Sequence, residues 1–470
     1  MLAALLVMAQ VCFIPLAWGG ETEPSSTLDW FSPQNAQATR QWSELLRDLG
    51  LSPENAAQVS REARSEALTQ ATLVLMHYQA QLQGKPLSNP GKRLASAVEQ
   101  GALAAFLALI TPQYQGFKRL RTVLAQELAR TQLPVPELTP MEGLGLGQSH
   151  PELSALRQVL AQRLGQTLPA VLVDRDVWDP PFIHLLRDYQ RQSGLTVTGT
   201  LTPETQRHLR VDPKRRIDTI RFSLLQWFQL PPAMDGLAIL VNIPHYQLVA
   251  LDQERVALVT SVVVGAPGSP TPRMNSRFSS ITFNPDWTPP QSILRDELLP
   301  QWRADQGSLA AQGFVWETAQ GSQLSWDGVT EHNIGDYLRQ YRLKQVAGRG
   351  NPLGRMRLNL KNSQAIYLHD TNRPDLFGRT KRDLSHGCVR INNIDALFAV
   401  LKEQESSRDA QRLLRALNAT QTQTQRLNAD VDVFLVYMPA WVGADNTLQL
   451  RPDIYGLVQP ELAAITKTLL

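Results

Sequence analysis

Cysteine is nearly absent from this sequence. The 470 residues contain 2 cysteines, Cys12 and Cys388. A scaffold held together by disulfides needs several pairs, so that class of protein is excluded. Cys12 lies in an apolar leader, and removal of the leader would leave Cys388 as a single thiol without an intramolecular partner.

An excess of charge of one sign is also missing. The 46 basic and 43 acidic residues give a formal net charge of +3. This balance is too small to indicate a protein that holds nucleic acid by its phosphates. Hydrophobic residues make up 43% of the chain, as in ordinary globular proteins. The length predicts about three domains.

Long apolar runs are missing after residue 18. Before that point the chain is apolar throughout, and Ala17-Trp18-Gly19 fits the small residues of a cleavage site. We therefore expect residues 1–19 to be a signal peptide, although the usual basic residues at its start are absent. An uncleaved anchor is the alternative, since the apolar run is barely long enough to span a bilayer.

The remaining thiol lies in the sequence Ser385-His386-Gly387-Cys388-Val389-Arg390, and His369 precedes it by 388 − 369 = 19 residues. This separation suits a strand end and a returning loop. A nearby histidine lowers the pKa of a thiol and later returns the proton to a leaving group. Gly387 permits a sharp turn that aims amides at an oxyanion, and Arg390 offers two donors to a carboxylate.

Three other interpretations of these residues stay open. A lone cysteine is often a small buried hydrophobe. Zinc could instead be bound by His369, Asp370, His386 and Cys388. The closely paired ligands of a structural zinc site are absent, however. Arg390 could be a surface ion-pair partner.

The motif and its upstream histidine together resemble the signature of the L,D-transpeptidases, which cross-link bacterial peptidoglycan. The resemblance implies that Cys388 is the nucleophile that carries the acyl group and that His369 is the base. It implies further that the oxyanion is stabilised by the amides of Gly387 and Cys388, with the hydroxyl of Tyr367.

The same resemblance gives the neighbouring residues smaller roles. Ser385 and His386 would shape the site, and Arg390 would orient a substrate carboxylate or support the loop. Acyl transfer conserves the energy of the amide, so no cofactor is needed.

Residues 20–147 and 213–233 are predicted to form an α-helical scaffold. Apolar residues recur there at helical spacing, as at Trp42, Leu45, Leu46 and Leu49. The second stretch repeats this pattern and is expected to pack back on the first. Proline and glycine between Leu133 and His150 mark a boundary.

Residues 148–212 are predicted to be a small three-helix module inserted in that scaffold. Its stretch from Tyr189 to Gly199, followed by Thr202, resembles a peptidoglycan-binding module. Thr198 stands where that family often has aspartate. The resemblance implies a glycan contact through this module.

Residues 234–470 are predicted to be a mainly β catalytic domain of L,D-transpeptidase type, which makes the fold class multidomain α+β. Alternation at Ile239, Val241 and Ile243 indicates a strand. Residues 289–350 interrupt the strands with a helical and loop-rich insertion. We interpret this insertion as a lid beside the site, with a decorative surface subdomain as the alternative.

The resemblance implies an enzyme of the periplasm or cell envelope whose partners are peptidoglycan stem peptides and not nucleic acid. A donor tetrapeptide would be attacked at the carbonyl of meso-diaminopimelate, D-alanine would leave, and the amine of a second stem would complete a 3-3 cross-link. Water as acceptor would make the protein an L,D-carboxypeptidase, and a lipoprotein lysine would make it an anchoring enzyme. A non-catalytic wall-binding scaffold is the third hypothesis, and the presence of both Cys388 and His369 argues against it.

Overall fold

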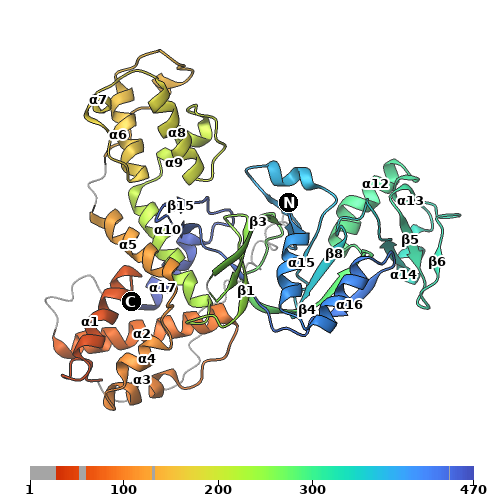
Figure 1. The fold of residues 1–470 in the computed structure, drawn as a ribbon, viewed down its shortest axis with the longest axis horizontal. Coiled ribbons are helices and arrows are strands. Elements are labelled where there is room, and N and C mark those ends of the chain that lie inside the picture. The colour runs from red at the N-terminus through yellow and green to blue at the C-terminus, as the bar shows by residue number, and fades with distance from the viewer. Residues whose placement is uncertain (1–27, 52–59, 130–132, 254, 444, 470) are drawn as a thin grey trace.

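The computed structural model describes residues 28–51, 60–129, 133–253, 255–443 and 445–469. Figure 1 shows helices and a small helical module on one side, a sheet in the middle and a smaller insertion on the far side. The predicted signal peptide, residues 1–19, and Cys12 lie outside the described residues. No helix in the described ranges is both long and apolar enough to cross a membrane.

Helices build the N-terminal region. Those before the small module are α1 (Ala36–Asp48), α2 (Arg61–Gln83), α3 (Pro90–Glu99), α4 (Leu103–Ala108) and α5 (Gln115–Ala129). After the module come α10 (Pro213–Gln226) and the 3-10 turn η4 (Trp227–Gln229). Ile220 and Leu224 of α10 share one hydrophobic cluster with the earlier helices, so the chain returns to this region as its apolar pattern predicts.

A second hydrophobic cluster belongs to the small module alone. Its elements are η3 (Thr139–Met141), α6 (Glu152–Leu164), α7 (Ala170–Val173), α8 (Pro180–Gln192) and α9 (Pro203–Leu209). The side-chain oxygen of Gln190 accepts hydrogen bonds from the backbone N–H groups of Thr198 and Gly199, both at 2.9 Å. Because Gln190 is fully buried, this motif residue serves to hold the turn.

The main sheet of the described chain is 10-stranded, with the order β10-β3-β11-β9-β8-β4-β13-β1-β2, and β12 pairs with β4. Its strands are β1 (Leu237–Asn242), β2 (Gln247–Asp252), β3 (Arg255–Gly265), β4 (Met274–Phe283), β8 (Met356–Leu360), β9 (Tyr367–His369), β10 (Asp383–Ser385), β11 (Val389–Ile391), β12 (Gln423–Arg426) and β13 (Asp432–Val436).

Alternation along β1 places the sheet between two cores. Ala238 and Leu240 pack into the cluster of the N-terminal helices. Ile239 and Val241 pack on the opposite face of the sheet, in a separate cluster that we call the sheet core. Successive strand residues point to opposite faces, which explains the division. The sheet core also contains residues of α15 (Ile394–Glu403) and α16 (Ser407–Leu417). The remaining elements are η6 (Pro374–Gly378), β14 (Ala440–Val442), β15 (Leu448–Leu450) and α17 (Val458–Leu469).

The insertion has a hydrophobic cluster of its own, built around Trp302, Phe314 and Trp316. Its helical elements are α11 (Gln291–Ile293), the π-helical turn η5 (Leu294–Leu298), α12 (Leu299–Ala304), α13 (Ser308–Ala311) and α14 (Ile334–Gln340). It also contains a three-stranded sheet of β6 (Gln323–Leu324), β5 (Phe314–Glu317) and β7 (Arg342–Gln345). The prediction of a helical and loop-rich segment is therefore incomplete, because β5 alternates buried and half-buried residues as a strand does.

Candidate active site

Strand register brings the motif residues together. The parallel pair of β9 and β11 sets Leu368 beside Val389 and His369 beside Arg390. Cys388, one residue before Val389, therefore lies next to Tyr367 rather than next to His369. The antiparallel pair of β8 and β9 sets Arg357 opposite His369.

The functional side chains share one face of these strands. Leu358, Leu368 and Val389 point into the core shared with α15. Their neighbours in sequence point the other way, because side chains alternate along a strand. Two rungs result. One contains Cys388 and Tyr367, and the other contains Arg357, His369 and Arg390.

The turn that carries Cys388 is closed by its own serine. The hydroxyl of Ser385 donates to the Cys388 carbonyl at 2.6 Å and accepts from the Gly387 N–H at 3.2 Å. Gly387 has φ +109, in the region that favours glycine. The predicted oxyanion donor at Gly387 is thus already bonded within the turn, which leaves the Cys388 amide and the Tyr367 hydroxyl as the better candidates.

Distant residues support the same turn. Thr271 donates its hydroxyl to the Gly387 carbonyl at 2.7 Å and accepts from the Gly265 N–H at 2.8 Å. The Tyr455 hydroxyl donates to the Gly265 carbonyl at 2.7 Å and accepts from the Thr271 N–H at 3.1 Å. A Cβ on Gly265 would lie 2.2 Å from a backbone oxygen of the loop, so this position requires glycine.

The Cys388 thiol is protonated in this arrangement. Burial raises the pKa of the thiol above its ordinary value, while hydrogen bonds from the backbone and hydroxyl of Tyr367 and the charges of Arg357 and Arg390 oppose the rise. The sulfur also lies 3.8 Å from the carbonyl oxygen of Ala365, an acceptor that favours the protonated thiol. The sequence argument expected a neighbouring histidine to lower this pKa, and burial outweighs that expectation.

His369 is buried and neutral. Burial and the positive charge of Arg390 lower the pKa of His369 to about 3, although the carbonyls of Asp370 and Pro352 favour the charged form. Nδ1 lies 2.6 Å from the Asp370 carbonyl oxygen. A carbonyl only accepts, so Nδ1 carries the proton and the lone pair lies on Nε2. A neutral imidazole with a free lone pair can act as a general base.

Tyr367 connects the thiol to the base of the insertion. Burial raises the pKa of Tyr367, and the negative charge that Cys388 gains when it ionises raises this pKa further. The Tyr367 hydroxyl therefore stays a donor, and it is also hydrogen-bonded to Trp287. Trp287 exchanges two backbone hydrogen bonds with Gln345 at 2.9 and 2.8 Å. Trp287, which contacts Tyr367, therefore lies just before the start of the insertion and pairs with Gln345 near its end.

A second contact joins the insertion to the motif. Nε2 of His386 lies 2.8 Å from a carboxylate oxygen of Glu297, which belongs to the π-helical turn η5. Both side chains are partly exposed. The charge of Glu297 also opposes the lowering, by burial, of the Arg390 pKa. The predicted site residue His386 thus faces the insertion.

The structure places all of the predicted site residues around one point: Tyr367, His369, Ser385, His386, Gly387, Cys388 and Arg390. It adds residues that the sequence argument missed: Arg357, Trp287, Glu297, Thr271 and Tyr455. For Arg357 a signal was available, since Met356-Arg357-Leu358 alternates and turns the arginine away from the core. Within the described ranges, no group of three or more His, Cys, Asp or Glu side chains is arranged to hold a metal ion.

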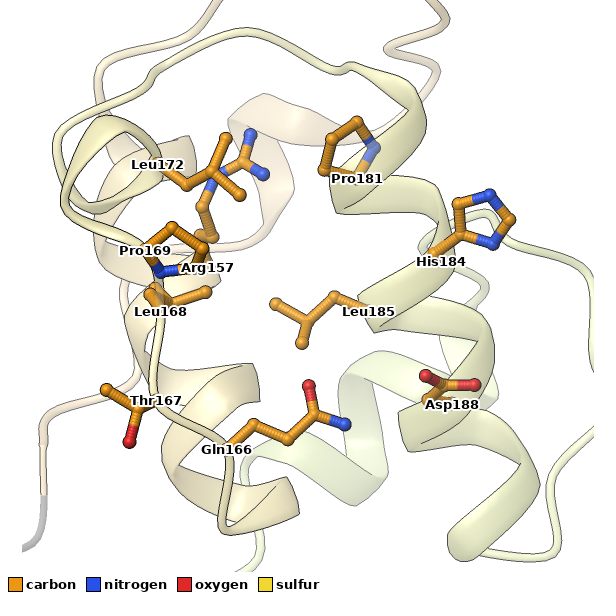
Figure 2. Close-up of a pocket in the computed structure, with 10 residues that line it drawn as sticks. All are labelled: Arg157, Gln166, Thr167, Leu168, Pro169, Leu172, Pro181, His184, Leu185 and Asp188. Atoms are coloured by element: carbon orange, nitrogen blue, oxygen red, sulfur yellow. The ribbon is translucent and has the colours of Figure 1, made fainter.

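A separate cavity lies in the small module, away from Cys388. It has a volume of about 160 Å³ between α6, α7 and α8. Figure 2 shows His184 and Asp188 projecting from α8 at its rim. Its lining includes Arg157, Gln166, Leu172, His184, Leu185 and Asp188.

The family of the sheet domain follows from comparison with known proteins. Residues 237–415 match the model of the YkuD family, described as the L,D-transpeptidase catalytic domain. The match covers much of the mainly β part of the chain, which a helical region precedes.

The chain is also similar to individual proteins. A protein of Haemophilus influenzae named putative L,D-transpeptidase is 35% identical over 218 residues, which cover 46% of this chain and 44% of that relative. The match thus spans less than half of either chain. The solved L,D-transpeptidase structure from Xylanimonas cellulosilytica is 14% identical, and the match covers 64% of this chain and 98% of that chain. The one from Stackebrandtia nassauensis is 12% identical, and the match covers 62% of this chain and 94% of that chain. Their TM-scores are 0.19 and 0.22.

Proposed function

We propose that this protein is a peptidoglycan L,D-transpeptidase that forms 3-3 cross-links between stem peptides through an acyl-enzyme on Cys388. The observation that carries the proposal is the position of Cys388 beside Tyr367 and one rung from His369, within a domain of this family. Location in the periplasm or cell envelope belongs to the same proposal, because the cross-linked wall lies there.

In the first step, Nε2 of His369 takes the thiol proton as the sulfur attacks the carbonyl carbon of meso-diaminopimelate. The new C–S bond leaves a negative oxygen, which accepts hydrogen bonds from the Cys388 amide and the Tyr367 hydroxyl. The C–N bond then breaks, and the departing amine of D-alanine takes the proton from His369. Since both groups start neutral, no charge has to be created before the substrate binds.

In the second step, an amine of another stem attacks the thioester. His369 takes the proton of this amine, the new C–N bond forms, and the C–S bond breaks. The proton then returns to the sulfur, which restores the neutral thiol and imidazole. One amide is exchanged for another, so the reaction requires no cofactor.

The insertion, residues 289–350, acts in this proposal as a lid that keeps water from the thioester. Two contacts support this role: the hydrogen bond between Trp287 and Tyr367, and the 2.8 Å contact between Glu297 and His386. The second contact joins the insertion directly to a residue beside the thiol, and the first does so through the backbone pair of Trp287 with Gln345. Exclusion of water would favour transfer to an amine over hydrolysis.

The small module contacts the glycan strands in this proposal. Its cavity offers apolar side chains from Leu172 and Leu185 and polar ones from His184 and Asp188, a mixture that suits a small polar ligand. Leu172→Asp should weaken co-sedimentation with purified peptidoglycan, and the exposed Val197→Asp outside the cavity should not. Unchanged sedimentation of the Leu172→Asp variant would remove the module from the proposal.

Mass spectrometry of muropeptides tests the reaction itself. The purified protein is incubated with tetrapeptide-containing muropeptides, and dimers linked through two diaminopimelate residues are expected. Trimmed tripeptides without dimers would identify an L,D-carboxypeptidase, and transfer to a lipoprotein lysine would identify an anchoring enzyme. No change in any of these substrates would favour the non-catalytic wall-binding scaffold.

A further inference from the structure

Two arginines flank His369 and present donors that the described residues leave unused. Arg357 lies opposite His369 on β8, and Arg390 lies beside it on β11. The Nε atom of each guanidinium is buried and has no hydrogen-bond partner among the described residues. A buried donor without an acceptor is costly, so a pair of them beside a thiol points to a ligand that supplies acceptors.

Both guanidinium groups lie close enough to affect the sulfur. The charges of Arg357 and Arg390 each favour the Cys388 thiolate. The guanidinium carbon of Arg357 lies 5.3 Å from the centre of the Tyr367 ring, and Tyr367 is hydrogen-bonded to the thiol. The two arginines therefore lie on the same face of the sheet as the thiol.

A carboxylate of the chain itself already lies in this neighbourhood. Glu297 contacts His386 at 2.8 Å, and its charge favours the charged form of Arg390. No ion pair within 4.0 Å joins Glu297 to either arginine in the described chain. The two guanidinium groups thus remain available to an external carboxylate.

We propose that Arg357 and Arg390 together bind the free α-carboxylate of the residue that departs in the first step. This inference rests on the proposed function and names the residues that select its donor. Arg390 lies in β11 and Cys388 directly precedes this strand, so two residues of extended chain, at most about 6.6 Å, separate them. A terminal carboxylate lies one residue beyond the scissile carbonyl, about 3.8 Å along the chain, so the arginine side chains can reach it.

The consequence is selection of chain ends. A donor with one residue after the scissile bond places a carboxylate between the arginines, where charge-assisted bonds form. A longer donor, or one with an amidated end, places a neutral amide there and leaves the guanidinium groups poorly matched. Sites built to bond a charged group reject analogues that lack it.

The experiment compares two donors, a stem tetrapeptide with a free C-terminal carboxylate and the same peptide with a C-terminal carboxamide. The variants are R357Q, R357K and R390Q, and R355Q is the matched control. Arg355 is exposed and pairs with Asp395 at 2.5 Å. The readout is kcat/KM for release of the terminal residue, and the melting temperature shows that each variant is folded.

The parent should use the free acid about ten- to a hundredfold better than the carboxamide. R357Q and R390Q should lose that preference by slowing far more on the free acid than on the carboxamide, R357K should keep part of it, and R355Q should keep all of it. Equal use of both donors by the parent, or an equal loss on both donors in R357Q, would overturn the inference while leaving the proposed function standing. If the parent releases nothing from either donor, the proposed function itself fails and the inference falls with it.

Discussion

Arg357 lies directly opposite His369 in the antiparallel pair of β8 and β9. On the other side of the same histidine lies Arg390. Burial lowers the pKa of His369 most, and the positive charges of Arg390 and, to a smaller extent, Arg357 add to this effect, so the pKa falls to about 3. The proposed base is therefore kept unprotonated at neutral pH, and it begins catalysis with its lone pair available.

Replacement of the thiol is the first prediction. Cys388→Ala should reduce formation of cross-linked muropeptides to background and leave the melting temperature within about 2 °C of the parent, because the side chain is small and only half-buried. Cys388→Ser should also be inactive, since a hydroxyl has a far higher pKa than a thiol. Cross-linking by either variant at the parental rate would exclude Cys388 as nucleophile.

Removal of the Tyr367 hydroxyl is the second prediction. Tyr367→Phe deletes a donor to the thiolate, so the pKa of Cys388 should rise further and alkylation by iodoacetamide at pH 8 should slow about tenfold. Rates measured by mass spectrometry over a range of pH give the pKa directly. Tyr341→Phe, in the insertion, should alkylate like the parent. Faster alkylation of the Tyr367→Phe variant would contradict the assigned hydrogen bond.

The third prediction concerns stability in acid. The pKa of His369 is about 3 in the folded protein and near 6.5 in the unfolded chain, so below pH 6.5 the unfolded chain takes up a proton that the folded protein refuses. Stability should therefore fall as the pH drops from 6.5 toward 3, by about 2 kcal/mol at pH 5 from this group alone.

Chemical denaturation of the His369→Gln variant tests this dependence. The variant should lose less stability than the parent between pH 7 and pH 5, because the protonatable ring is gone. His332→Gln removes an exposed ring and should retain the parental dependence. An identical pH dependence in His369→Gln and the parent would mean that folding does not lower the pKa of His369.

The contact between the insertion and the motif gives the fourth prediction. Glu297→Gln removes the charge that faces His386, so the lid should hold the site less firmly and a larger share of the acyl-enzyme should react with water. The ratio of tripeptide to cross-linked dimer should rise several-fold. Asp296→Asn is the matched control, because the carboxylate of Asp296, next to Glu297 in the sequence, is exposed and pairs with Arg295 instead of His386.

An unchanged product ratio in Glu297→Gln would show that this contact does not restrain the lid. Loss of all products, with Cys388 still open to alkylation, would instead give Glu297 a part in substrate binding. Both results are read from the same chromatograms as the parental reaction.

The site could be predicted from the sequence as far as its motif extends. Six consecutive residues and His369 mark the thiol and its base, because local chemistry requires these residue types. The alternation at Met356-Arg357-Leu358 turns Arg357 away from the core, but only the pairing of two strands shows that it stands opposite His369. The contact of Glu297 with His386 joins residues that are 386 − 297 = 89 positions apart, and no local sequence pattern predicts it.

The fold shows a similar division. Alternation predicted β1, and apolar spacing predicted that α10 returns to the earlier helices. The sheet within the insertion was missed, because its strands are short and lie among helical segments. The sequence argument expected the pKa of Cys388 to be lowered, but it is raised. A sequence can indicate which residues lie near the thiol, but it does not show how deeply the thiol is buried, and here burial has the larger effect.

The hydrogen bonds from Thr271 and Tyr455 also set an order of assembly. Tyr455 follows Cys388 by 455 − 388 = 67 residues, so during synthesis the thiol emerges before the hydroxyl that completes the support of its turn. Until that segment docks, Gly265 and Thr271 lack the partner that fixes their loop. We therefore expect the turn that carries Cys388 to lack its final conformation in a newly made chain, so that the thiol is unreactive. Cross-linking activity should appear only when the segment after β15 has folded into place.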